Sequence, residues 1–251
     1  MSYRLSILVI AKNEEKQIAN CLETLNFGDE IVVILDSCKD NTKKIAQKYT
    51  KIIFSGSWKN EGERRNYGIS KCKSEWILEI DADERVSEFL SREIKEVIRI
   101  SKYDYHHIPV MNYIGKDPVK FGWGAYFGKS AYPGLFRNGV KKWGRQRVHP
   151  ELTWTGSKGP MLNGRVKHFV DRNISDMIRR LDSYTSARAR DIREQNEQGS
   201  YLQNIRRIFS RFIKCYIGRK GYKEGGYGLL IALLAALYPI ISYIKARNED
   251  S

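Results

Sequence analysis

Two aspartates separated by a single residue, Asp81 and Asp83, directly follow an apolar run at residues 76–80. Two carboxylates with this spacing at the end of a strand can point to the same side and share a hard cation such as Mg²⁺ or Mn²⁺. A cation held in this way bridges diphosphate oxygens and offsets the charge that develops on a leaving group. The pair alone is weak evidence because it is common in surface loops, so its meaning depends on the elements around it.

Apolar runs alternate with segments of helical periodicity through the first hundred residues. The apolar runs lie at residues 5–10, 30–35, 51–54 and 76–80, and the helical segments lie at 14–25, 42–49, 60–70 and 88–100. Near-continuous apolar strands joined by helices predict an α/β fold with a mostly parallel sheet sandwiched by helices. Ligands bind such sheets beyond the carboxyl ends of the strands. We therefore expect a binding site just after residues 10, 35 and 80.

Polar motifs stand at those strand ends and in the third helical segment. They are Ala11-Lys12-Asn13-Glu14, Asp36-Ser37-Cys38-Lys39-Asp40, Glu63-Arg64-Arg65-Asn66-Tyr67-Gly68 and Asp81-Ala82-Asp83. Together they resemble the inverting family 2 glycosyltransferases of GT-A (Rossmann-like) fold, over about residues 4–100. Where that family has Gly-Ser in the second motif, this chain has Cys38-Lys39. The resemblance implies a metal-dependent enzyme that transfers a sugar from a nucleotide-sugar donor, with a UDP-hexose expected.

The resemblance also implies roles within residues 1–100, the expected nucleotide-sugar-binding half. Asp83 would ligate Mg²⁺ or Mn²⁺ directly. The donor-binding residues would be Asn13 and Glu14 in the base pocket, Asp36 on the base or ribose, Arg65 on the diphosphate, and Asp81 on the ribose or, through water, the metal. A guanidinium suits phosphate oxygens. Asp36 could instead cap a helix, and Arg65 could lie on a solvated helix face.

Residues 101–200 form the expected acceptor-binding half, with long loops predicted over 103–170. Three segments follow one another in an order that resembles the lipopolysaccharide-core β-glucosyltransferase subgroup. They are Leu135-Phe136-Arg137, Arg147-Val148-His149-Pro150-Glu151 and Lys167-His168-Phe169. Inverting transfer needs a base to deprotonate the acceptor hydroxyl. Glu151 is the expected base, with His149 orienting it or contacting the acceptor. Pro150 separates the two, so either could hold the position of the subgroup's Glu, and Glu151 could also be an exposed turn carboxylate.

Four further residues are candidate ligands. His168 could complete a metal site begun by a carboxylate, because a neutral imidazole can serve as a ligand, although a lone histidine is more often structural. Arg137 and Arg147 could bind phosphates of the acceptor. Trp123 could offer an apolar face to a sugar ring, and core packing explains this tryptophan nearly as well. The acceptor that the resemblance implies is a lipid-linked or lipopolysaccharide-core-type saccharide.

The positive charge of the chain is confined to its later part. There are 44 Lys and Arg against 29 Asp and Glu, a net charge of +15, and residues 1–100 hold 17 of each kind. The remaining 27 basic and 12 acidic residues, and with them the whole excess, lie in residues 101–251. A basic half predicts a polyanionic partner, either nucleic acid or an anionic membrane, unless the proteome is generally basic.

Residues 201–251 form a basic and apolar tail with helical periodicity. Residues 202–217 place apolar side chains on one helical stripe and basic ones on the opposite face, which is typical of a membrane-surface helix. Residues 225–244 carry no charge and have about the length that spans ~30 Å of hydrocarbon. This segment could lie on the bilayer, span it or pack on the catalytic domain. Its Gly, Pro and Tyr residues make it less apolar than a typical membrane span, so a position on the bilayer is favoured. We expect residues 202–244 to contact an anionic membrane surface.

Other functions fit parts of the sequence. A basic nucleic-acid-binding protein would explain the charge, but no nucleic-acid motif is present, so no nucleic-acid partner is expected. A nucleotidyltransferase usually has a Gly-rich loop after the first strand, and residues 11–14 contain no glycine. A glycosyltransferase for a different cell-envelope or protein acceptor stays open. The N-terminus has no secretory-signal pattern and the four cysteines form no CxxC pair, so we expect a cytoplasmic protein attached peripherally to the inner face of the cell membrane.

Overall fold

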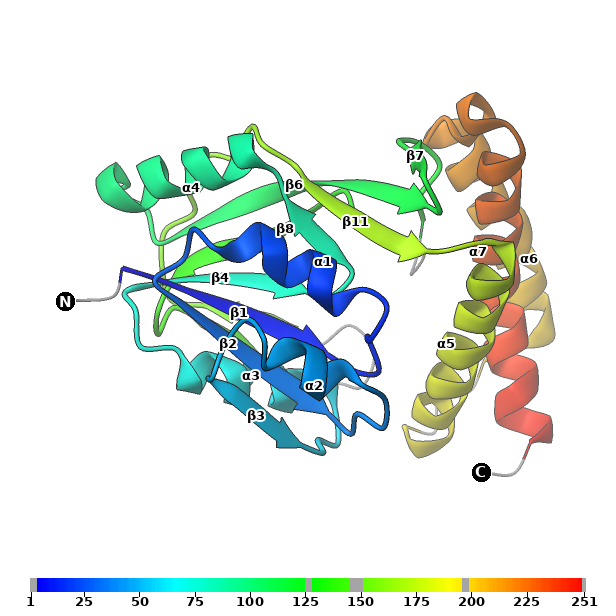
Figure 1. The fold of residues 1–251 in the computed structure, drawn as a ribbon. Helices are drawn as coiled ribbons and strands as arrows, with labels where there is room; N and C mark the ends of the chain where they lie inside the picture. The colour runs from blue at the N-terminus through cyan, green and yellow to red at the C-terminus, as the bar shows by residue number, and fades with distance from the viewer. Residues whose placement is uncertain (1–3, 125–127, 145–150, 196–198, 250–251) are drawn as a thin grey trace. The chain divides into compact units, whose positions relative to one another are not determined.

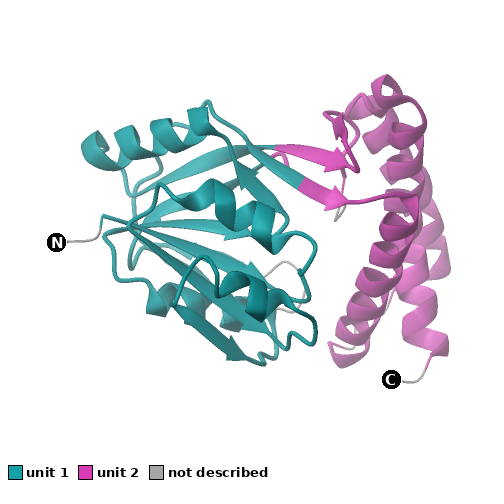
Figure 2. Cartoon of the chain, viewed as in Figure 1, with its two compact units in different colours: residues 1–110, 131–168 teal, residues 111–130, 169–251 magenta. Residues whose placement is uncertain are grey.

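The computed structural model describes residues 4–124, 128–144, 151–195 and 199–249. The chain divides into two compact units, coloured teal and magenta in Figure 2. Unit 1 comprises residues 1–110 and 131–168, and unit 2 comprises residues 111–130 and 169–251. Strands β6 (Tyr105–Ile114) and β11 (Val166–Asp171) carry the chain from one unit into the other.

Unit 1 contains a sheet with helices on both faces (Figure 1). Its first part contains β1 (Leu5–Ala11), α1 (Ile18–Leu22), β2 (Glu30–Asp36), α2 (Thr42–Ala46), β3 (Ile53–Gly56), α3 (Glu61–Lys71), β4 (Trp76–Asp81), β5 (Glu84–Val86) and α4 (Glu88–Ile100). β1 pairs in parallel with β2 and β4, and β2 pairs in parallel with β3. The alternation of strands and helices predicted from the sequence is confirmed here.

The later part of the sheet is antiparallel. Strand β8 (Ala131–Arg137) lies beside β4, and the order of strands is β3-β2-β1-β4-β8-β6-β11-β5, with β7 (Asp117–Val119) paired to β6. A separate hairpin is formed by β9 (Lys141–Trp143) and β10 (Leu152–Trp154). These strands fall where the sequence predicted long loops. Gly, Pro and Lys interrupt their apolar positions, so their periodicity is too weak to reveal strands.

Alternate residues of β4 belong to opposite faces of the sheet. Leu78 and Ile80 join the core shared with α1, α2 and α4, whereas Ile77 joins the core shared with α3 and β8. Side chains alternate along a strand, so Glu79 and Asp81 lie on the same face as Ile77. The register of β4 therefore places these two carboxylates on the face that α3 covers.

Helix α3 approaches the sheet closely at Gly68. A Cβ atom added there would lie 2.7 Å from Leu8 Cδ1 and 3.0 Å from Ile34 Cγ1, and both of those side chains are fully buried. Glycine costs about 1 kcal/mol of helix propensity relative to alanine. The close contact explains why this helix carries a glycine on its inner face.

We predict that Gly68→Ala lowers the free energy of unfolding by about 1–3 kcal/mol, because overpacking outweighs the gain in helix propensity. Urea unfolding followed by circular dichroism measures the change. Ser70→Ala, at an exposed position of the same helix, is the control and should change the free energy by less than about 0.5 kcal/mol. A Gly68→Ala protein as stable as the wild type would contradict this close approach.

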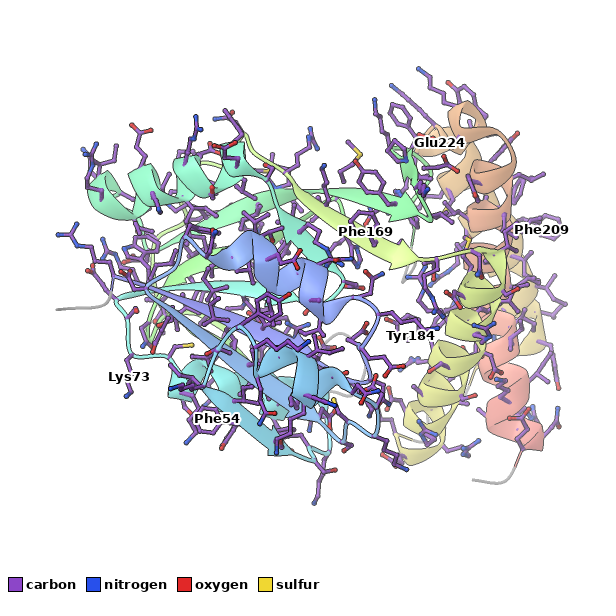
Figure 3. All side chains as sticks on the ribbon, in the orientation of Figure 1. Phe54, Lys73, Phe169, Tyr184, Phe209 and Glu224 are labelled. Atoms are coloured by element: carbon purple, nitrogen blue, oxygen red, sulfur yellow. The ribbon has the colours of Figure 1, made fainter. Side chains whose placement is uncertain are left out.

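Unit 2 is mainly helical. Besides β7 it contains α5 (Ile174–Glu194), α6 (Tyr201–Ile213), a π-helical turn (Lys214–Gly218), a 3₁₀ turn (Gly221–Glu224) and α7 (Gly225–Asn248). α7 packs against α5 and α6 (Figure 1), and its Ile231 and Ala235 join a core with Met177 and Leu181 of α5. Glu224, labelled in Figure 3, accepts hydrogen bonds from the backbone amides of Lys120 and Phe121 at 2.8 and 2.9 Å.

The apolar C-terminal segment is part of this helical unit. In the described part of the chain, Gly221–Asn248 is the one helix whose length and composition would allow it to cross a membrane. Its most apolar stretch is 56% buried inside the protein. Packing within unit 2 therefore accounts for a large part of its apolar surface.

Candidate active site

The carboxyl ends of β1 and β2 carry loops that are joined by hydrogen bonds. Asn13 Oδ1 accepts from the Lys39 amide at 2.8 Å, and the Glu14 amide donates to Thr42 Oγ1 at 2.8 Å. Asn13 and Ser37 have left-handed backbones, with φ of 57° and 51°. Non-glycine residues in this region are uncommon and gather at functional sites. The structure thus brings the first two motifs together, with the Asn13 side chain supporting the second loop.

Asp36 is buried at the end of β2 and is surrounded by cations. Its Oδ2 lies 2.9 Å from Arg64 Nη1 and 3.6 Å from Lys12 Nζ, and its Oδ1 accepts from Ser37 Oγ at 3.0 Å. Helix α2 begins at Thr42, whose amide donates to Asp40. Asp36 is therefore not a helix cap, and its contact with a base or ribose stays a prediction.

The Asp81–Glu84 turn is held by groups from several elements. Glu84 Oε2 accepts from the Asp81 amide at 3.0 Å and from Tyr132 Oη of β8 at 3.2 Å. Arg85 Nη1 donates to the carbonyls of Ala82 and Glu84 at 3.0 and 2.7 Å, and Arg85 Nη2 donates to the carbonyl of Gln17 at 3.0 Å. These bonds fix the backbone that carries Asp81 and Asp83, although neither aspartate receives them on its side chain.

His168 lies beside Asp83. Its Nε2 is 3.3 Å from Asp83 Oδ2. The cause is the antiparallel pairing of β5 with β11, in which His168 is opposite Glu84. A carboxylate and an imidazole in contact can share a hydrogen bond or can flank a divalent cation. Among the residues that the structure describes, no group of three or more His, Cys, Asp or Glu side chains is arranged to hold a metal.

Arg65 lies in a cluster of carboxylates. Its Nε, Nη1 and Nη2 contact Glu61, Glu79 and Asp81 at 2.7, 2.6 and 2.9 Å. Burial alone would lower the pKa of Arg65, but Asp81, Glu79 and Glu61 outweigh it and raise that pKa. The side chain is only 10% exposed, so it does not lie on a solvated helix face. Its predicted contact with a diphosphate would be made by an arginine already held by three carboxylates.

The hairpin β9–β10 is attached to the beginning of α3. Asn66 Oδ1 and Nδ2 bond the amide and the carbonyl of Trp143 at 2.9 and 2.8 Å. The Gly144 amide donates to the Glu151 carbonyl at 2.7 Å, and a Cβ atom on Gly62 would overlap the Gly144 carbonyl. Glu151 therefore stands directly before β10, at the loop end of the hairpin and near the start of α3, with an exposed side chain.

Two of the remaining predicted site residues lie elsewhere, and two fall outside the described residues. His149 and Arg147 are outside the described residues. Arg137 is opposite Trp76, at the start of β4 and therefore at the sheet edge away from Asp81, where it pairs with Glu75. Trp123 is 9% exposed in the core of unit 2, and its Nε1 donates to the Val119 carbonyl at 2.7 Å. The structure thus does not bring Arg137 to the Asp81 edge, and it leaves little of the Trp123 ring for a sugar.

Several site residues were missed in the sequence. Glu79 is 1% exposed within β4 and contacts Arg65 and Lys141. A single acidic residue in the apolar run 76–80 was a usable signal, because a buried carboxylate requires a partner. Lys141, Tyr132 and Arg85 gave no local signal. Their places depend on strand pairings between residues far apart in the chain.

A model of glycosyl transferase family 2 matches residues 6–132, which is about half of the chain. The chain belongs to glycosyltransferase family 2. A lipopolysaccharide core biosynthesis glycosyltransferase of Rhizobium meliloti, LpsC, is 23% identical over 98% of this chain and 93% of its own length. An uncharacterized glycosyltransferase of Rickettsia prowazekii is 24% identical over 98% of this chain and 87% of its own length.

A solved structure shares the fold of this glycosyltransferase. S. aureus TarS 1–349 in complex with UDP-GlcNAc has a TM-score of 0.53 at 14% identity, over 97% of this chain and 87% of that chain. The predicted family, the GT-A fold and the assignment as a glycosyltransferase are therefore confirmed. The roles of individual residues stay predictions.

The loop after β2 of this glycosyltransferase carries a half-buried thiol, Cys38, whereas Cys21, Cys72 and Cys215 are buried. Burial raises the pKa of Cys38, and it raises that of Cys72 to about 12. We predict that iodoacetamide labels the folded protein only at Cys38, slowly at pH 7 and faster as the pH rises, because the thiolate is the nucleophile. Mass spectrometry after labelling measures this, with Cys38→Ser as the control. Labelling of Cys21 or Cys72 in folded protein would contradict the burial described.

Proposed function

We propose that this enzyme transfers a hexose from a UDP-linked donor, with inversion, to a lipid-linked or lipopolysaccharide-core-type saccharide. The observation that supports the UDP-linked donor is that three carboxylates lie at one edge of the sheet, those of Asp36, Asp81 and Asp83. In this proposal residues 1–100 bind the donor, 101–200 bind the acceptor and 201–251 form the membrane-associating tail. The names of LpsC and of the TarS complex support the acceptor and donor classes.

The carboxylates at this edge suit a divalent cation beside a diphosphate. Asp83 and His168 would be protein ligands, and diphosphate oxygens would fill other positions, which fits the preference of Mg²⁺ and Mn²⁺ for oxygen. When bound, the cation offsets charge on the departing UDP. Asp81, held by Arg65 at 2.9 Å, would face the ribose or a metal-bound water. Asn13 and Glu14 would line the base pocket beside Asp36.

Glu151 is the proposed general base. In an inverting transfer the acceptor oxygen bonds to the anomeric carbon while the bond from that carbon to the diphosphate oxygen breaks. The hydroxyl proton passes to the base as the new bond forms. Glu151 is exposed at the loop end of hairpin β9–β10, where it can meet an acceptor from solvent, and His149 would orient it or contact the acceptor.

We predict that Asp83→Asn lowers Mn²⁺-stimulated hydrolysis of UDP-hexoses by about 10²–10³-fold, because a cation ligand contributes several kcal/mol to the transition state. Circular dichroism should show an unchanged fold. Glu96→Gln, an exposed acid on α4, is the matched control and should retain full activity. Full Mn²⁺-stimulated activity in the Asp83→Asn protein would rule out the assignment of the metal site.

Replacing the proposed base should separate chemistry from donor binding. Glu151→Gln is expected to slow sugar transfer to the acceptor by about 10²–10⁴-fold while UDP affinity, measured by calorimetry with Mn²⁺, changes less than about threefold. A collapse of UDP affinity together with activity would show that Glu151 belongs to the donor site instead.

We propose that α6 provides the membrane contact of residues 202–244. Its Leu202, Ile205, Phe209 and Ile213 form an exposed apolar stripe. Phe209 is 65% exposed and points away from the neighbouring helices in Figure 3. The flanking exposed basic residues are Arg206, Arg207, Lys214, Arg219, Lys220 and Lys223. This pairing of an apolar stripe with basic flanks suits an anionic bilayer surface. It would hold the enzyme on the inner face of the cell membrane.

Vesicle sedimentation can distinguish the α6 stripe from α7. We predict that Phe209→Asp combined with Ile213→Asp weakens binding to phosphatidylglycerol-containing vesicles at least tenfold, because it puts charge into the stripe. Leu233→Asp, at a 44% exposed position of α7, is the matched control and should bind nearly as wild type. If Leu233→Asp alone abolished binding, α7 would be the membrane contact.

A further inference from the structure

Four charged side chains are linked by three successive ion pairs, and this series ends at Asp81. Lys141 Nζ lies 2.5 Å from Glu79 Oε2, Glu79 Oε1 lies 2.6 Å from Arg65 Nη1, and Arg65 Nη2 lies 2.9 Å from Asp81 Oδ1. The Lys141 and Glu79 side chains are 1% and 2% exposed. The series of ion pairs joins three segments. Lys141 is the first residue of the hairpin strand β9, Arg65 is on α3, and Glu79 and Asp81 are on β4.

Stability alone is a poor explanation for these buried charges. Removing an ion from water costs several kcal/mol, and apolar side chains of similar volume often replace a buried ion pair without loss. Aromatic rings lie next to both cations here. Lys141 Nζ lies 4.6 Å from the ring centroids of both Phe136 and Trp143, and Arg65 Cζ lies 4.9 Å from that of Trp143.

Orientation is what the charges add. An arginine presents its donors in a planar fork, so fixing two of its nitrogens fixes the direction of the third. Glu61 and Glu79 hold Nε and Nη1 of Arg65, and Nη2 then points at Asp81. Glu79 is in turn held by Lys141, which also donates to the Pro133 carbonyl at 3.1 Å.

We propose that Glu79 and Lys141 are positioning residues for the transfer reaction. They set the Arg65 fork that orients Asp81, and they tie the hairpin carrying Glu151 to the strand that ends in Asp81. The donor side and the acceptor side of the site are then aligned by one buried carboxylate. The proposal rests on the proposed function, because it takes Asp81 and Glu151 as parts of the two sides.

The test uses the double variant Glu79→Gln/Lys141→Met in the whole chain. Both members of the ion pair are removed together, so that neither is left as a buried charge without its partner. Three properties are measured: thermal stability, UDP affinity with Mn²⁺ by calorimetry, and the rate of UDP-hexose hydrolysis. We expect hydrolysis at least tenfold slower (a loss of about 1.4 kcal/mol) and a smaller loss of UDP affinity, because Asp81 stays at the end of β4 and only its orientation changes. The single variant Lys141→Arg keeps the positive charge next to Glu79 and should retain a third or more of the wild-type rate.

The matched control is Asp171→Asn/Arg180→Met. It removes a partly buried ion pair of 2.7 Å in unit 2, outside the proposed site, and should leave the hydrolysis rate unchanged whatever its effect on stability. Hydrolysis at the wild-type rate in Glu79→Gln/Lys141→Met would overturn the inference. If the Lys141→Arg protein hydrolysed UDP-hexoses as slowly as the double variant, that result would also overturn the inference. Failure of the wild type to bind UDP or hydrolyse any UDP-hexose would refute the proposed function itself.

Discussion

The register of three parallel strands decides where the charged groups of this protein lie. In the pairing of β1 with β2 and β4, Ile10 is opposite both Ile34 and Asp81, and Ala11 is opposite Leu35. The three strands therefore end at nearly the same level, and Asn13, Asp36 and Asp81 meet at one edge. Apolar residues fill the strands up to that edge because both faces are covered. Polar chemistry is confined to the strand ends, where helix starts and loops can meet it.

Glu79 is the exception to this division, and its partners show how the exception is tolerated. Burial alone would raise the pKa of Glu79, but Lys141 and Arg65 outweigh it and lower that pKa. The carboxylate therefore stays charged within the sheet. Its two cations come from α3 and from β9, elements that the chain reaches before and after β4. A charge that is costly by itself thus joins β4 to α3 and to the hairpin.

The sequence predicted the structure of the first hundred residues well because the signals there are local. Apolar runs and helical spacing located β1, β2 and β4 within a residue or two, and the motifs at their ends were visible beside them. The structure of residues 101–171 depends on antiparallel pairings between distant segments. Nothing near His168 indicates that β11 pairs with β5 and brings this side chain to Asp83. Lys141 stands in a Lys-Lys pair that reads as surface charge, and only the tertiary structure shows it buried.

Anomalous diffraction can show whether Asp83 binds the cation. Crystals grown with UDP and Mn²⁺ would be measured at a wavelength where manganese scatters anomalously. We expect an anomalous peak within about 2.5 Å of an Asp83 carboxylate oxygen, in contact with the diphosphate and near His168 Nε2. A bound UDP whose diphosphate has no manganese at Asp83, or a manganese peak elsewhere, would contradict it.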